Sequence, residues 1–166
     1  MKEDDITVLA RELGEACGVQ GRRLAIAESC TGGGIAEAIT RVAGSSGWFD
    51  RGFVTYSDAA KVEMLGVSEE TLAAHGAVSE ETVREMAVRS LERSAAHATV
   101  AVTGIAGPSG GSVEKPVGLV WFAWSVRGGP VVVESRRFGG NRDGVRRQAV
   151  IYALRGLLEL LRNTAA

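Results

Sequence analysis

Residues 24–34 read LAIAESCTGGG, and this stretch decides the fold. Its apolar start, from Leu24 to Ala27, has the length of a β-strand, and its glycines open a helical pattern over 35–42. A strand that leads directly into a helix is the repeating unit of an α/β sheet. Ser29 then lies at the strand-to-helix turn, near unpaired helix-start N–H groups, which can bind an anion or a developing oxyanion.

Helical and strand-like patterns also occur along the rest of the chain. The patterns predict helices over 6–17 (closed by Gly18), 32–43, 58–65, 68–75, 79–94 and 143–161, and strands over 23–28, 49–56, 99–102, 117–126 and 131–138. Ser68 and Ser79 each precede two glutamates, which is typical of a helix start. The order predicts an α/β fold: a three-layer α/β/α sandwich with a mixed, mostly parallel sheet of about five strands and a C-terminal hairpin plus helix. We expect one domain over 1–166.

Composition narrows the class of protein. The chain has 166 residues, of which 45% are hydrophobic and 23% charged, as in ordinary soluble globular proteins. A formal net charge of −1 gives no general attraction to nucleic acid or acidic membranes, and no apolar stretch is long enough to span a bilayer. The charged start, Met1 to Asp5, does not resemble a signal peptide. Cys17 and Cys30 form no disulfide framework, so we expect a cytoplasmic protein.

Several kinds of site are disfavoured by the sequence. A serine hydrolase usually uses a histidine base, but His75 and His97 occupy positions typical of structural or solvated side chains. Zinc-binding spacings are missing, and the glycine loops lack both the P-loop lysine and the GxGxxG spacing. We therefore expect neither a metal nor a cofactor.

A serine with an amine base is the arrangement that these exclusions leave. Lys61 follows Tyr56 by five residues, where a predicted strand leads into a helical turn. A buried lysine loses water, which lowers its pKa and allows it to act as a base, as in known Ser–Lys pairs. From these residues alone the alternative stays open that Lys61 is a surface helix residue and Tyr56 caps a strand.

Six motifs occur along the chain in one order. They are AESCTGG (27–33), YSDAAK (56–61), GAVS (76–79), TGIAGP (103–108), EKPVG (114–118) and FGGNR (138–142). Over residues 5 to 162 the chain resembles the CinA C-terminal domain family, whose enzymes are nicotinamide-nucleotide amidohydrolases of the PncC type. The resemblance implies deamidation of nicotinamide mononucleotide to nicotinate mononucleotide and ammonia. It also implies the stand-alone form, without the additional N-terminal domain of larger CinA proteins.

The resemblance assigns roles to particular residues. Ser29 is similar to the family's nucleophile, and Tyr56 and Lys61 match its proton-handling pair. The expected backbone donors to an oxyanion are Cys30, Thr31, Gly32 and Gly33. The expected substrate-binding residues are Thr103, Gly104, Ala106, Gly107, Gly110, Gly111 and Ser112, with Arg142 first and Lys115 second as cations for the 5′-phosphate.

One position departs from the family pattern, because Asp58 stands where asparagine is expected. A carboxylate near Lys61 favours the charged amine and opposes its use as a base.

The main alternative is a nucleotide-binding sensor of the same fold, linked to competence or DNA damage, that does not cleave its ligand. A phosphoester hydrolase ranks lower. We expect a small nucleotide substrate, no nucleic-acid or membrane partner, and a homo-oligomer. We expect Trp48, Trp121 and Trp124 in the core or an interface, unless one stacks on the pyridine ring.

Overall fold

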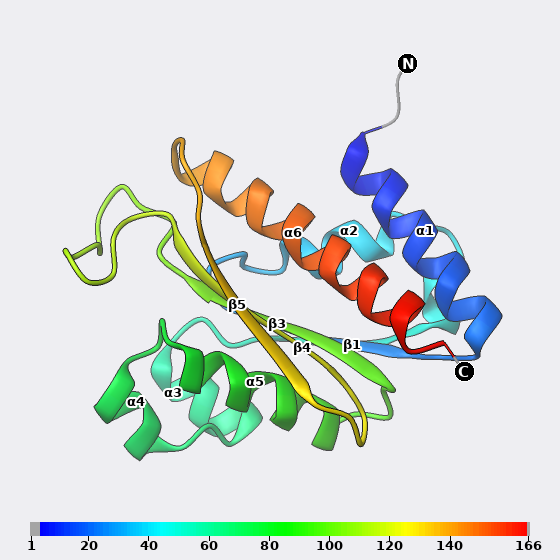
Figure 1. Cartoon of the computed structure of the whole chain (residues 1–166), viewed down its shortest axis with the longest axis horizontal. Helices are drawn as coiled ribbons and strands as arrows, with labels where there is room; N and C mark the ends of the chain where they lie inside the picture. The colour runs from blue at the N-terminus through cyan, green and yellow to red at the C-terminus, as the bar shows by residue number, and fades with distance from the viewer. Residues whose placement is uncertain (1–3, 166) are drawn as a thin grey trace.

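The computed structural model describes residues 4–165, so the first three residues of the charged start of the chain lie outside it. Figure 1 shows the elements in chain order. They are α1 (Asp5–Gln20), β1 (Leu24–Glu28), α2 (Gly34–Thr40), the 3-10 turn η1 (Ser45–Gly47), β2 (Phe49–Val54), α3 (Asp58–Ala60), the π-helical turn η2 (Lys61–Leu65), α4 (Glu69–His75), α5 (Glu80–Glu92), β3 (Ala98–Gly104), β4 (Leu119–Val126), β5 (Val131–Arg137) and α6 (Arg142–Asn163).

The strands form one sheet in the order β2-β1-β3-β4-β5. Strand β1 pairs in parallel with both β2 and β3, whereas β4 is antiparallel to β3 and to β5. All five residues of β1 are buried, because helices cover both faces of the parallel part of the sheet. The predicted mixed sheet and C-terminal hairpin are confirmed.

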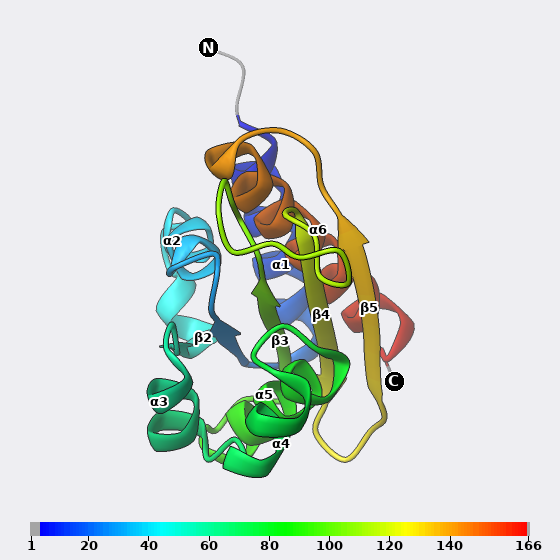
Figure 2. The same cartoon turned by 90° about the vertical axis from the view of Figure 1, so that its left-hand side faces the viewer.

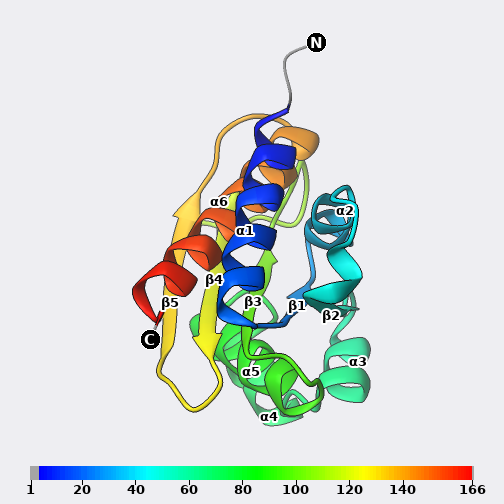
Figure 3. The same ribbon diagram turned by 90° about the vertical axis from the view of Figure 1, so that its right-hand side faces the viewer.

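Helices form the two outer layers. Helices α1, α2 and α6 lie on one side of the sheet, and α3, α4 and α5 lie on the other (Figure 1). Alternate strand residues therefore serve two cores. Ile26, Val100 and Phe122 pack under α6, and Ala27 and Ala101 pack with α5 on the other side. The predicted three-layer sandwich is confirmed, and Figure 3 shows α1 beside α6 in the upper layer.

Several helix boundaries differ from the sequence prediction, and glycine conformation explains two of them. Helix α1 continues through Gly18 and ends at Gln20, since Gly21 is the residue that takes a left-handed conformation, with φ of 62°. Helix α2 begins at Gly34 rather than 32, because Gly32 and Gly33 have φ of 57° and 95° and form a turn. The turn keeps the peptide groups after Ser29 outside the helix.

The predicted serine caps are present on the other side of the sheet. The Ser68 hydroxyl accepts a hydrogen bond from the N–H of Thr71, and the Ser79 hydroxyl accepts one from Thr82. Between residues 4 and 165 no helix has the length and apolar character needed to cross a membrane.

Candidate active site

The carboxyl ends of β1, β2 and β3 meet at one edge of the sheet, because these three strands run parallel. Ser29 follows β1, Tyr56 follows β2, and Gly104 ends β3. Figure 2 shows the chain after β3 rising toward the start of α6 at this end of the molecule. A cavity of about 290 Å³ opens there and is lined by Ser29, Cys30, Tyr56, Lys61, Ala77, Val78, Thr103, Gly104, Ile105, Ala106, Gly107, Ser109, Gly110 and Arg142.

Ser29 and Lys61 are in direct contact at the base of this cavity. The Lys61 Nζ donates to Ser29 Oγ at 3.0 Å and to the backbone oxygen of Thr55 at 2.7 Å. The Lys61 side chain is 0% exposed. Burial lowers the pKa of Lys61 from its ordinary value of 10.5, and this effect outweighs the charge of Asp58, which raises it.

Local backbone structure explains why Lys61 points inward. Ser57 caps α3 by accepting a hydrogen bond from the N–H of Ala60. The helix then widens into the π-helical turn at Lys61, and a π-turn within a helix is frequent at functional sites. The alternative of a surface lysine is thereby excluded. Asp58, in contrast, is exposed.

The expected oxyanion donors divide into two groups. The Gly32 N–H is used in the turn, because it donates to the carbonyl oxygen of Ser29 at 3.0 Å. That expectation is therefore wrong for Gly32. The N–H groups of Cys30, Thr31 and Gly33 have no acceptor within residues 4–165. These three groups are the donors that remain for an oxyanion, and of the three residues Cys30 lines the cavity whereas Thr31 and Gly33 lie behind its lining.

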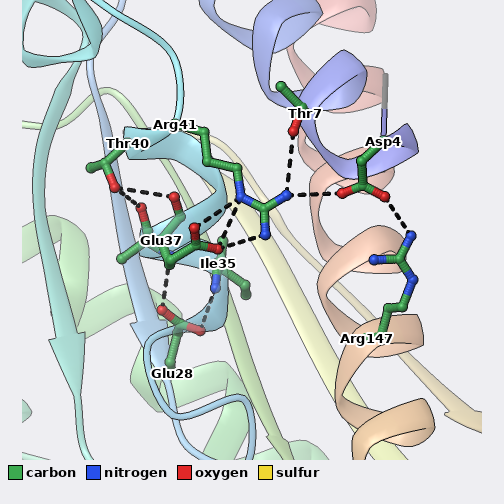
Figure 4. Close-up of polar contacts among 9 residues, drawn as sticks. Asp4, Thr7, Glu28, Ile35, Glu37, Thr40, Arg41 and Arg147 are labelled. Atoms are coloured by element: carbon green, nitrogen blue, oxygen red, sulfur yellow. Dashed lines mark hydrogen bonds and ion pairs between the residues drawn. The ribbon is translucent and has the colours of Figure 1, made fainter. Parts of the chain in front are cut away.

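Glu28 occupies the N-terminus of α2, whose N–H groups were expected to be available to an anion or a developing oxyanion. Its carboxylate is fully buried and accepts hydrogen bonds from the Thr31 hydroxyl at 2.6 Å, the Ile35 N–H at 2.8 Å and the Ala36 N–H at 3.1 Å. Figure 4 shows this carboxylate beneath the first turn of the helix. An acidic residue at the end of an apolar strand, just before a glycine-rich helix start, is the sequence signal for such a cap.

Tyr56 contacts Arg142 rather than the Ser29–Lys61 pair. The Arg142 guanidinium donates to the Tyr56 hydroxyl at 2.9 Å and to the Gly107 carbonyl at 2.8 Å. The Tyr56 side chain is 60% exposed. The two side chains thus lie together at the wall of the cavity, and the geometry gives Tyr56 no direct contact with Ser29 or Lys61 among the hydrogen bonds of the described chain.

The glycine-rich loop after β3 is only partly in the cavity. Thr103 holds the end of β3 to the α4–α5 connection, since its hydroxyl donates to the Ala77 carbonyl at 2.8 Å. Gly111 and Ser112 line a neighbouring hollow that also contains Arg137. The Lys115 amine donates to the His75 carbonyl and does not line the cavity, so the structure does not bring it to the site.

Several residues of the site were missed by sequence reasoning. Thr55 supplies the carbonyl that holds Lys61, and Ala77 and Val78 line the cavity. Ile105 and Ser109 also line it, as members of the loop over 103–112 that the resemblance assigns to substrate binding. Arg146 of α6 contacts the loop after Ser29 from outside the cavity lining. The GAVS and TGIAGP motifs were the available signal for the lining residues, but no signal marked Arg146.

Other candidate groups can be placed as well. Burial raises the pKa of the Cys30 thiol to about 12, so this cysteine is no thiolate at neutral pH. Trp48 and Trp124 are buried in the core, and no tryptophan lines the cavity within the described chain. Within residues 4–165, no three His, Cys, Asp or Glu side chains gather as a metal-binding group.

The sheet order and the buried Ser29–Lys61 pair define an α/β/α protein that can activate a serine hydroxyl at the carboxyl edge of its parallel strands. The chain belongs to the CinA C-terminal domain family, whose family model matches residues 6–161. The resemblance deduced from the six motifs is thereby confirmed.

Known proteins are similar over nearly the whole chain. Nicotinamide-nucleotide amidohydrolase PncC of Escherichia coli (strain K12) is 52% identical over 165 residues, which cover 99% of this chain and 100% of that protein. The protein of the same name from Pseudomonas putida is 55% identical over 157 residues, covering 95% and 98%. The crystal structure of the competence/damage inducible protein CihA from Agrobacterium tumefaciens superposes with a TM-score of 0.93 at 50% identity, covering 96% and 98%.

Proposed function

We propose that this protein hydrolyses the carboxamide of nicotinamide mononucleotide to nicotinate mononucleotide and ammonia. The observation that carries the proposal is the 3.0 Å contact between Lys61 Nζ and Ser29 Oγ, made by a lysine that is fully buried. The name of the PncC relatives, 52% and 55% identical to this chain, supports the choice of substrate.

The first half of the reaction acylates Ser29. Neutral Lys61 takes the hydroxyl proton as Ser29 Oγ forms a bond to the carboxamide carbon, and the carbonyl electron pair moves to oxygen. The N–H groups of Cys30, Thr31 and Gly33, which have no acceptor within residues 4–165, are the candidate donors to that oxyanion. When the tetrahedral intermediate collapses, the C–N bond breaks and the proton on Lys61 leaves with ammonia.

The second half releases the acid. Lys61 takes a proton from water, the resulting hydroxide attacks the acyl carbon, and the bond to Ser29 Oγ breaks as the proton returns to the serine. Lys61 therefore serves as base and acid in turn, which requires a pKa below the ordinary lysine value. The lowered pKa that burial causes fits this requirement.

The remaining cavity residues are assigned to binding. We assign the 5′-phosphate to Arg142, to the N–H groups of Ala106, Gly107, Ser109 and Gly110 and, beyond the cavity, to the Gly111 N–H and the Ser112 hydroxyl. Tyr56 acts in this proposal through its contact with Arg142.

A cytoplasmic location and self-association stay predictions, which cell fractionation and analytical ultracentrifugation test.

The experiment measures ammonia and nicotinate mononucleotide formed by EDTA-treated protein, with nicotinamide, its riboside, its mononucleotide and its dinucleotide as substrates. We expect equal amounts of both products and the highest kcat/KM with the mononucleotide. Binding of the mononucleotide without ammonia release supports the sensor alternative. Activity that is lost on chelation and restored by a divalent cation contradicts the Ser–Lys mechanism.

A further inference from the structure

Arg146 of α6 donates hydrogen bonds to the two peptide groups that follow Ser29. Its Nε donates to the carbonyl oxygen of Cys30 at 3.2 Å, and its Nη2 donates to the carbonyl oxygen of Thr31 at 3.2 Å. The Arg146 side chain does not line the cavity. Two consecutive carbonyl groups are thus turned toward α6.

The direction of these carbonyls fixes the direction of an N–H group. In a planar trans peptide the C=O and N–H bonds point in opposite directions. The peptide whose oxygen is Cys30 O carries the N–H of Thr31, which therefore points away from Arg146. This N–H has no acceptor within residues 4–165, whereas the next N–H, that of Gly32, closes the turn on Ser29 O.

Glycine at position 32 leaves space for the Arg146 side chain. A Cβ at Gly32 would lie 3.2 Å from Arg146 Nη2, and the φ of 57° at Gly32 suits glycine. Helix α6 is anchored beside Arg146 by the buried side chains of Val145 and Ala149. Helix α6 therefore holds the guanidinium against a turn whose Thr31 carbonyl also accepts a hydrogen bond from the Gly34 N–H at 2.9 Å.

We propose that Arg146 is a positioning residue that aims the Thr31 N–H at the oxyanion formed on Ser29. The inference rests on the proposed amidase function and extends it to a group that touches no substrate. As Ser29 Oγ bonds to the carboxamide carbon and the electron pair moves to oxygen, a donor that is already oriented stabilises the new charge without reorganisation. The hydrogen bond from the Arg146 cation to Cys30 O also polarises the peptide and strengthens its N–H as a donor.

The test compares Arg146→Met, Arg146→Lys and the control Arg147→Met. Arg147 is the next residue of α6, but it is exposed and pairs with Asp4 of the α1 start at 2.7 Å (Figure 4). The control therefore removes one positive charge from the same helix without touching the loop. Lysine keeps the charge at 146 but has a single donor atom, so it cannot hold both carbonyls in the geometry of a guanidinium.

The readouts are kcat and KM for ammonia release, together with the melting temperature of each variant. We expect kcat to fall by about 10²-fold in Arg146→Met and by about tenfold in Arg146→Lys, with KM within about threefold of wild type. Arg147→Met keeps the wild-type kcat. The lysine variant decides the matter if the methionine variant does not fold.

A second readout isolates the oxyanion. Ser29 Oγ adds to the carbonyl carbon of the pyridine-3-carbaldehyde analogue of nicotinamide mononucleotide while Lys61 takes the hydroxyl proton. The carbonyl electron pair moves to oxygen, which then occupies the oxyanion position. We expect the affinity of the Arg146 variants for this analogue, measured by calorimetry, to fall by the same factor as kcat. An unchanged kcat, a raised KM at constant kcat, or an equal loss in Arg147→Met overturns the inference. Inactive wild-type protein overturns the proposed function and this inference together, whereas active wild type with unchanged Arg146 variants overturns the inference alone.

Discussion

Lys61 Nζ lies 3.0 Å from Ser29 Oγ although 32 positions separate the two residues in the chain. The contact exists because β1 and β2 are parallel neighbours, so that the segments following them emerge at the same edge of the sheet. The amine is buried with two oxygen acceptors, Ser29 Oγ and Thr55 O. The site therefore holds a serine and a potential base in contact before any substrate binds.

Replacing Lys61 by methionine removes the base and the buried amine together. We expect Lys61→Met to lower kcat by about 10²- to 10⁴-fold, the usual contribution of general acid–base catalysis. The variant should stay folded, because methionine fills a similar apolar volume. Steady-state kinetics and thermal melts check both points. A variant with near-wild-type kcat would exclude Lys61 as the base.

The same variant tests the lowered pKa through stability. At a pH between the folded pKa of Lys61 and the ordinary value of 10.5, the unfolded chain binds a proton that the folded chain does not. The stability of wild type relative to Lys61→Met should therefore rise with pH in this window, by at most about 1.4 kcal/mol per pH unit. Urea unfolding at several pH values measures the difference. A difference independent of pH contradicts the lowered pKa.

Asp58→Asn introduces the residue that the family resemblance leads us to expect at this position. The Asp58 charge raises the pKa of Lys61, so its removal should lower that pKa further. Since Lys61 must be neutral to act as a base, the acidic limb of the kcat/KM profile should move to lower pH, with more activity below the wild-type limb. A superimposable pH profile would show that the exposed Asp58 carboxylate has no influence on the base.

Tyr56→Phe separates a binding role from proton transfer. The hydroxyl accepts a hydrogen bond from Arg142 and makes none to Lys61 or Ser29 within the described chain. We expect KM to rise several-fold and kcat to fall by less than about tenfold, because the loss affects mainly the placement of Arg142. If kcat instead falls by about 10²-fold or more at constant KM, Tyr56 transfers a proton in the reaction.

Glu28→Gln tests the buried cap under α2. The carboxylate accepts three hydrogen bonds on two oxygens, and an amide has only one acceptor atom. We expect a loss of about 1–3 kcal/mol in the free energy of unfolding, measured in urea. The matched control is Glu37→Gln on the same helix, whose carboxylate is exposed and pairs with Arg41; it should cost less than about 0.5 kcal/mol. Equal effects of the two substitutions contradict the cap.

Sequence periodicity predicted the layers of this fold because each strand and helix has a strong pattern of its own. The continuous apolar runs of β1 and β3 identify strands buried on both faces, and the helix caps Ser68 and Ser79 are local signals. Helix ends were less predictable. Gly18, Gly21 and Gly32 are the same residue type, so the sequence does not show which of them ends a helix or delays its start. Only the backbone conformation shows this.

The candidate site was predicted in its identities but less well in its contacts. The motifs predicted that Ser29, Tyr56 and Lys61 belong to one site. Which of these side chains are in contact depends on their directions in the folded structure. The π-helical turn that buries Lys61 has no sequence signal in the chain. The distant guanidinium of Arg146, 116 positions from Cys30, could be found only when α6 was placed against the loop.

Ammonia release from nicotinamide mononucleotide by wild type and by Ser29→Ala, side by side, tests the central claim most directly. We predict that wild type forms ammonia and nicotinate mononucleotide in equal amounts. Ser29→Ala should lose at least about 10³-fold in kcat, keep its fold by circular dichroism and still bind the nucleotide by calorimetry. Wild-type protein that binds but releases no ammonia, or a Ser29→Ala variant that keeps most of the wild-type kcat, would contradict the account.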